Sequence, residues 1–149
     1  MTSSIQDAVT VEVRRIVEQA TFMFTEELKT PPQDDSWADL GVFITFCGEP
    51  SGWIHLWTTD NFAKASAMNM LGMDCADDIT FDNKRDSLKE LLNIAAGHVL
   101  TSVFGKNLLF ELGIPEPLST ALLKHDMQDA RASWIDADGE PLLIVFRLI

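Results

Sequence analysis

The chain has 149 residues, of which 46% are hydrophobic and 23% charged, and this is the size and composition of one globular domain spanning residues 1–149. Its formal net charge of −12, without any local cluster of Lys and Arg, argues against nucleic acid as a partner. No stretch approaches the roughly 18 apolar residues of a membrane span. The N-terminus lacks the apolar segment of a secretory signal, so we expect a cytoplasmic protein without a membrane partner.

The first part of the sequence predicts a helix followed by a β-hairpin. Apolar residues repeat with helical spacing over residues 4–28, and the two prolines in TPPQDDS (30–36) end that helix. Two runs rich in β-branched and aromatic residues, 39–48 and 53–59, flank the turn-rich GEPSG. We therefore expect these two runs to form the hairpin.

Two further helices and a second pair of strands are expected after the hairpin. The first helix spans Asp60–Leu71, with Asp60 as its N-cap and Gly72 as its C-cap. The second runs from about Asp82 to Phe104, and Gly105 is placed to end it. A short strand is expected at 118–124, and two strands joined by the turn DADG close the sequence.

The last strand lies within LLIVFRLI (142–149), which is apolar on both of its faces. Such a strand is either central in a sheet or buried at a subunit contact. Left at an open edge, it would promote aggregation.

One face of the helix at 82–104 carries polar residues. At about 100° per residue, Asp86, Glu90, Asn93 and Gly97 fall within roughly 60° of one another around the helix axis. Apolar residues occupy the opposite side at the spacing of a buried stripe, namely Leu88, Leu91, Leu92, Ala95 and Val99. The helix therefore buries one face and exposes the other.

The common motifs for metal ligation, nucleotide binding and serine nucleophiles do not occur in the sequence. The acids of the connector before this helix lack the ligand spacing of an EF-hand loop, and a solvated connector explains them. The three histidines follow no zinc-binding pattern. No phosphate-binding loop and no serine-nucleophile elbow is present, so we expect no metal ligands and no nucleotide site.

Three residues of this polar face belong to a longer pattern of spaced residues in the sequence. Asp86 is followed after three residues by Glu90, after two more by Asn93, and after twenty-one more by Pro115. With NIAAG around the Asn, this pattern resembles the signature of the CheC/CheX/FliY family of chemotaxis phosphatases, an Asp or Ser, a Glu, an Asn and a distant Pro at these intervals. Only one copy is present, as in the single-site CheX-like branch.

The resemblance implies an α+β fold of the CheX/CheC type, a mainly antiparallel sheet with long helices packed on it. It also implies a phosphatase that hydrolyses the aspartyl phosphate of a CheY-type receiver domain. Asn93 would then position the attacking water and Glu90 would dock on the receiver's lysine. Asp86 would make a polar contact at the rim, Gly97 would allow close approach of the partner's backbone, and Pro115 would shape the adjacent loop.

In this interpretation the chain has no cofactor of its own, because the phosphorylated receiver supplies the Mg²⁺. CheX-like proteins are dimers built through their sheets, so the resemblance implies a homodimer, and the strand at 142–149 suits pairing across a two-fold axis. Two alternatives remain open. The chain could be a non-catalytic receiver-binding module, or an assembly protein of the motility apparatus.

Overall fold

The computed structural model describes residues 2–149, and Met1, the first residue of the expected domain, lies outside the described residues. Its helices and strands follow in chain order as α1 (Thr2–Thr21), β1 (Thr25–Glu27), β2 (Leu40–Cys47), β3 (Gly52–Thr58), α2 (Asp60–Leu71), α3 (Phe81–Phe104), β4 (Glu111–Leu112), β5 (Glu116–Pro117), α4 (Leu123–Met127), β6 (Ala132–Ala137) and β7 (Glu140–Leu148). Over residues 2–149, no helix is both long and apolar enough to cross a membrane.

The strands form one antiparallel sheet in the order β1-β6-β7-β3-β2-β4, and β5 also pairs with β2. β7 is central, because it pairs with β6 along one side and with β3 along the other. This confirms a central position for the apolar final strand. The predicted pairing of that strand across a two-fold axis is wrong, because both of its edges are already hydrogen-bonded within the chain. The homodimer itself stays a prediction.

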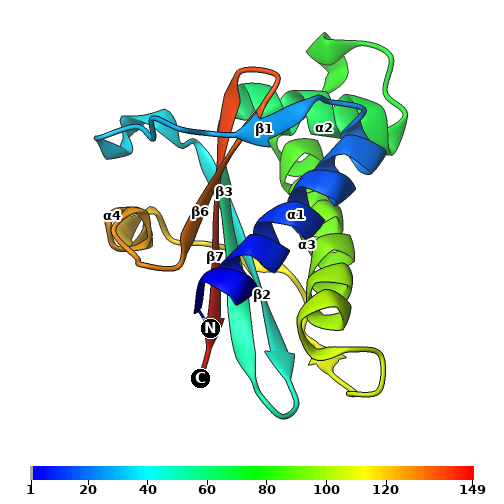
Figure 1. The fold of residues 1–149 in the computed structure, drawn as a ribbon. Coiled ribbons are helices and arrows are strands. Elements are labelled where there is room, and N and C mark those ends of the chain that lie inside the picture. Colours follow the sequence, from blue (N-terminus) through cyan, green and yellow to red (C-terminus); the bar gives the residue numbers. More distant parts are fainter. Residues whose placement is uncertain (1) are drawn as a thin grey trace.

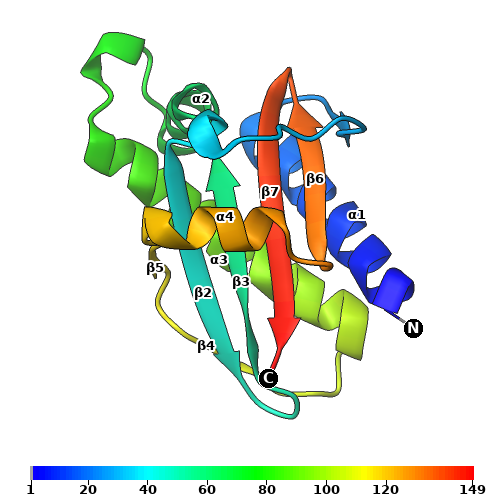
Figure 2. The same ribbon diagram turned by 90° about the vertical axis from the view of Figure 1, so that its left-hand side faces the viewer.

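Helices cover both faces of the sheet. α1, α2 and α3 lie on one face, and the short α4 crosses the other (Figures 1 and 2). The main hydrophobic core lies between the three helices and the sheet, and its largest fully buried side chains include Phe46, Phe62, Ile44, Ile54 and Leu88. The fold is therefore the predicted α+β arrangement of long helices on an antiparallel sheet.

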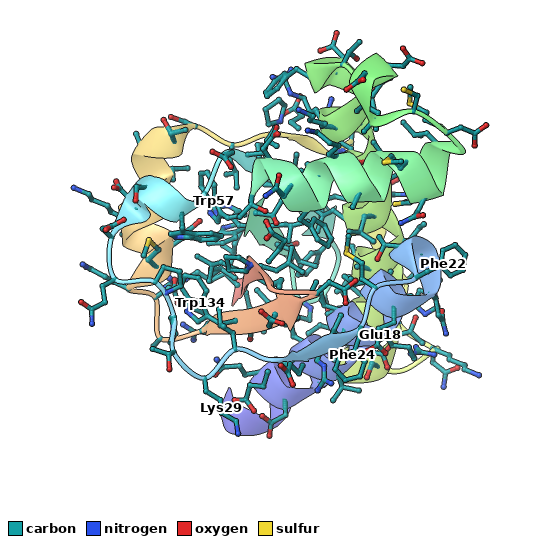
Figure 3. All side chains as sticks on the ribbon, turned by 90° about the horizontal axis from the view of Figure 1, so that it is seen from above. Glu18, Phe22, Phe24, Lys29, Trp57 and Trp134 are labelled. Carbon is teal, nitrogen blue, oxygen red and sulfur yellow. The ribbon has the colours of Figure 1, made fainter. Side chains whose placement is uncertain are left out.

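A second, smaller core lies between α4 and the sheet. Figure 3 shows Trp57 and Trp134 on this side. Asp126 of α4 is 2% exposed, and its Oδ2 lies 2.7 Å from Nδ1 of His55 and accepts a hydrogen bond from Nε1 of Trp57 at 2.8 Å. The predicted strand at 118–124 is wrong, because a helical segment is needed here to bring Asp126 onto the tryptophan-rich face of the sheet.

The first helix ends earlier than predicted. α1 stops at Thr21 instead of residue 28, and Phe22 adopts a φ of 61°. The carboxylate of Glu18 accepts hydrogen bonds from the backbone N–H and the hydroxyl of Thr25, at 3.1 and 2.7 Å. Thr25 opens β1, which pairs with β6. The helical pattern of apolar residues continued past this point, but pairing with the sheet determined the backbone conformation.

The remaining boundaries differ little from the sequence-based expectations. The hairpin of β2 and β3 and the terminal pair of β6 and β7 are confirmed. Gly72 caps α2 with a left-handed φ of 68°, as predicted. The N-cap of α2 is Thr59, not Asp60, because the Thr59 hydroxyl accepts the hydrogen bond from the backbone N–H of Phe62. Asp60 is instead the first helical residue.

Candidate functional site on helix α3

Local sequence determines where α3 begins and ends. Thr80 and Asn83 form a reciprocal capping box, in which each side chain accepts the other residue's backbone N–H at 3.0 Å. At the other end, Gly105 has a φ of 86° and donates its N–H to the carbonyl of Thr101. Gly105 therefore ends the helix as predicted.

Packing on both sides fixes the orientation of α3. The helix contacts α1, α2 and β2, and its apolar stripe is buried against them. The buried members are Leu88, Leu91, Leu92, Ala95, Ala96, Val99 and Leu100. Opposite this stripe, Asp86, Glu90 and Asn93 are exposed and Gly97 is half-buried. Four of the five candidate residues therefore share one outward face.

The polar groups on this face are not engaged by the rest of the protein. Among the described residues, the side chains of Asp86, Glu90 and Asn93 form no hydrogen bond and no ion pair. Two nearby cations have other partners, since Lys84 pairs with Asp60 at 2.7 Å and Arg85 lies over the ring of Phe81. The carboxylates and the carboxamide are therefore available to an external molecule.

Gly97 is not required by the fold of the chain itself. A Cβ atom built at this position meets no other atom within 4 Å. Glycine within a helix costs about 0.5–1 kcal/mol relative to alanine. The contacts of the described residues therefore do not require a glycine here, and helix propensity alone would favour alanine.

A groove adjoins this glycine. It has a volume of about 250 Å³, and Gly97, Leu100 and Thr101 of α3 line it together with the segment that follows the helix. In that segment Leu108 and Leu109 are exposed, and Leu109 keeps 90% of its surface accessible. Sequence reasoning missed this apolar surface, because consecutive leucines are ordinarily read as core.

Pro115 does not belong to α3 but lies between β4 and β5, both of which pair with β2. Backbone hydrogen bonds attach its segment to β2, from Gly113 N to the carbonyl of Thr45 and from Leu118 N to that of Gly41, both at 2.8 Å. Pro115 is half-buried. Its position agrees with a residue that shapes the chain beside β2, the strand over which α3 packs.

No metal centre is visible within residues 2–149, because no three His, Cys, Asp or Glu side chains come close enough together to hold an ion. This includes the acidic connector between α2 and α3, part of which forms a single 3-10 turn at Ala76–Asp78. The side chains of the connector lie exposed or half-exposed.

The fold and these surfaces define an α+β protein whose candidate site is an open helix face with an apolar groove at one end. The family model described as chemotaxis phosphatase CheX matches residues 40–136, well over half of the chain. The chain belongs to this CheX family of chemotaxis phosphatases. No curated protein matches it.

Solved structures share the fold across nearly the whole chain. A putative chemotaxis protein from Desulfovibrio vulgaris Hildenborough is 16% identical, with 98% of this chain and 97% of that chain covered and a TM-score of 0.71. CheX from Vibrio vulnificus is 13% identical, with 99% of each chain covered and a TM-score of 0.70. A CheX–CheY–BeF3–Mg²⁺ complex from Borrelia burgdorferi is 15% identical, with 95% and 96% covered and a TM-score of 0.67. At such identities the likeness concerns the fold alone.

Proposed function

We propose that this chain hydrolyses the aspartyl phosphate of a CheY-type receiver domain, with Asn93 positioning the water and Glu90 docking on the receiver's lysine. The observation that carries the proposal is the exposed polar face of α3, whose side chains form no hydrogen bond or ion pair among the described residues, in a member of the CheX family. The Borrelia burgdorferi relative binds CheY in its solved complex, which supports a receiver as the partner class.

The chemistry of an acyl phosphate explains why so few groups suffice. The phosphoryl group has a good leaving group, so catalysis needs mainly a water held in line with the phosphorus. The carboxamide oxygen of Asn93 can accept a hydrogen bond from that water. Because the carboxamide is neutral, it does not repel the phosphoryl oxygens as a carboxylate would. The partner's Mg²⁺ would neutralise the phosphoryl charge, so no metal ligand is needed on this chain.

Glu90 and Asn93 are placed to act together. They lie three positions apart on one helix, with two residues between them, which corresponds to about 4.5 Å along the axis. One helix face can therefore bring both side chains into the same receiver site. An ion pair between Glu90 and a lysine of the receiver would set the depth of insertion. Asp86, one further turn away, would contact the rim of the partner.

The glycine and its groove complete the docking surface. A receiver backbone can approach α3 closely at Gly97, where no side chain intervenes. Leu108 and Leu109 beside it would be covered by apolar groups of the receiver. Contact with these leucines would remove apolar surface from water and so favour association.

The experiment compares Asn93→Ala with Asn61→Ala, an exposed asparagine of α2 that serves as a matched control. A receiver is phosphorylated with a small phosphodonor in the presence of Mg²⁺, and phosphate release is followed with each protein. We expect Asn93→Ala to lose at least about a hundredfold in rate. Its unfolding transition and receiver binding should stay unchanged, because an exposed side chain contributes little to stability.

Three outcomes would contradict the proposal. Undiminished hydrolysis by Asn93→Ala would remove the assigned catalytic role. If the unmodified protein binds a phosphorylated receiver without accelerating phosphate loss, the chain is a receiver-binding module. If it does neither, an assembly role in the motility apparatus becomes the better interpretation.

A further inference from the structure

A cavity of about 270 Å³ lies between the first turns of α1 and the adjacent ends of β6 and β7. None of the residues that line it belongs to α3. Figure 1 shows this region where the two chain ends approach each other, away from the α3 face. Ile5, Val9 and Phe146 provide apolar walls. The volume is near the lower end of the range that holds small organic ligands.

One wall carries a buried hydroxyl without a partner. Ser133 is 5% exposed, and its Oγ is the one buried side-chain polar atom in the described residues that forms no hydrogen bond. The side chain projects towards α1, because Ser133 lies on the same face of β6 as Ile135 and Ala137, both of which belong to the core under the helices. An unpaired buried hydroxyl is unfavourable, so this group needs a donor or acceptor inside the cavity.

An exposed cation lines the same cavity. Arg131 lines the same cavity two residues before Ser133, and its guanidinium has no hydrogen bond or ion pair among the described residues. The nearest acid, Asp129, is already satisfied by Nη1 of Arg147 at 2.5 Å and by the backbone N–H of Arg131. Gln6, the other polar lining residue, donates to the carbonyl of Ala132. Among the polar lining side chains, the guanidinium and the hydroxyl are therefore the two that form no hydrogen bond within the described residues, whereas Gln6 forms one through its Nε2.

We propose that this cavity binds a small monocarboxylate with an apolar tail. The carboxylate pairs with the guanidinium of Arg131, whose planar fork matches two carboxylate oxygens, and it accepts a hydrogen bond from the Ser133 hydroxyl. The tail lies against Ile5, Val9 and Phe146. A single negative charge fits best, because Arg131 is the one charged residue among those that line the cavity and the chain already carries a formal net charge of −12. This inference does not depend on the receiver or on the phosphatase reaction.

Calorimetric titration with hexanoate and with 1-hexanol tests the proposal. The two probes share a tail of the same length and differ in charge. We expect hexanoate to bind and 1-hexanol to bind at least about tenfold more weakly, because the alcohol cannot form charge-assisted hydrogen bonds with the guanidinium. Chemical shifts of the Ile5 and Val9 methyl groups should move on addition of hexanoate, which places the ligand in the cavity.

Variants then assign the contacts. Arg131→Gln should weaken hexanoate binding about tenfold or more, and Ser133→Ala about threefold to fivefold. Arg85→Gln removes a positive charge on α3 and should leave binding unchanged, which separates a local contact from a change in net charge. The proposal is overturned if hexanoate does not bind at millimolar concentration, if 1-hexanol binds equally well, or if Arg131→Gln and Arg85→Gln behave alike.

Discussion

Replacement of Gly97 by alanine should stabilise the protein and impair its function at the same time. The added methyl group meets no atom within 4 Å, so it introduces no clash within the chain. Alanine in a helix interior is favoured over glycine by about 0.5–1 kcal/mol. At roughly 2–4 °C per kcal/mol for a chain of this size, the melting temperature should rise by about 1–4 °C.

The same methyl group projects from the face assigned to the receiver. If the partner's backbone contacts α3 at Gly97, the methyl group displaces it from Glu90 and Asn93. Misplacement of reacting groups by about 1 Å lowers rates strongly, so we expect phosphate release to fall at least about tenfold. Calorimetric unfolding and the receiver dephosphorylation assay measure the two effects on one sample.

Ser102→Ala is the matched control, because Ser102 is an exposed residue of α3 outside the polar face. This substitution also improves helix propensity, and it should leave hydrolysis unchanged. A Gly97→Ala protein that is less stable than the parent would refute the conclusion that the fold leaves this position open. A stabilised variant with full activity would refute the close approach of a partner at Gly97.

Three further predictions concern docking, acid stability and assembly. Glu90→Ala should weaken receiver binding and reduce its dependence on salt, and an unchanged salt dependence in titrations would contradict the ion pair. Hydrogen bonds from Thr25 hold the pKa of Glu18 below its ordinary value of 4.5, so their stabilisation is present above that pH and is lost on acidification. Glu18→Gln should therefore unfold more easily in urea at about pH 7, with a difference that narrows as the pH falls below the ordinary pKa of the carboxyl; a constant difference would be evidence against this role. Light scattering at micromolar concentration should give twice the chain mass, and a monomer would exclude the homodimer.

The exposed face of α3 could be predicted from sequence because it depends on helix geometry alone. Once a helix spans this segment, a period of 3.6 residues places Asp86, Glu90 and Asn93 on one side, whatever the rest of the chain does. The cap at Gly105 is equally local, since it depends on one residue with a positive φ, which glycine adopts without a steric penalty. The α+β architecture was expected from the resemblance to the CheC/CheX/FliY family, which the pattern on this same helix carries.

Features that depend on contacts between distant residues could not be predicted. The end of α1 is set by β1 pairing with β6, more than a hundred residues later in the chain. The residues near 123 do not indicate a helix. α4 is held in place by contacts between the carboxylate of Asp126 and the side chains of His55 and Trp57, which lie about seventy residues earlier in the chain. The position of Pro115 is a similar case. From the sequence we expected it to shape a loop beside the signature helix, but the pairing of its segment with β2 is a contact between distant residues and could not be predicted.

The central position of β7 has a consequence for synthesis of the protein on the ribosome. β6 with β1, and β3 with β2, are two separate antiparallel pairs that only residues 140–148 join. Until that segment has left the exit tunnel, both pairs present an open edge and the three long helices have an incomplete surface to pack on. The nascent chain should therefore acquire its cooperative fold late, and holdase chaperones that recognise unpaired strand edges should bind it until β7 is inserted.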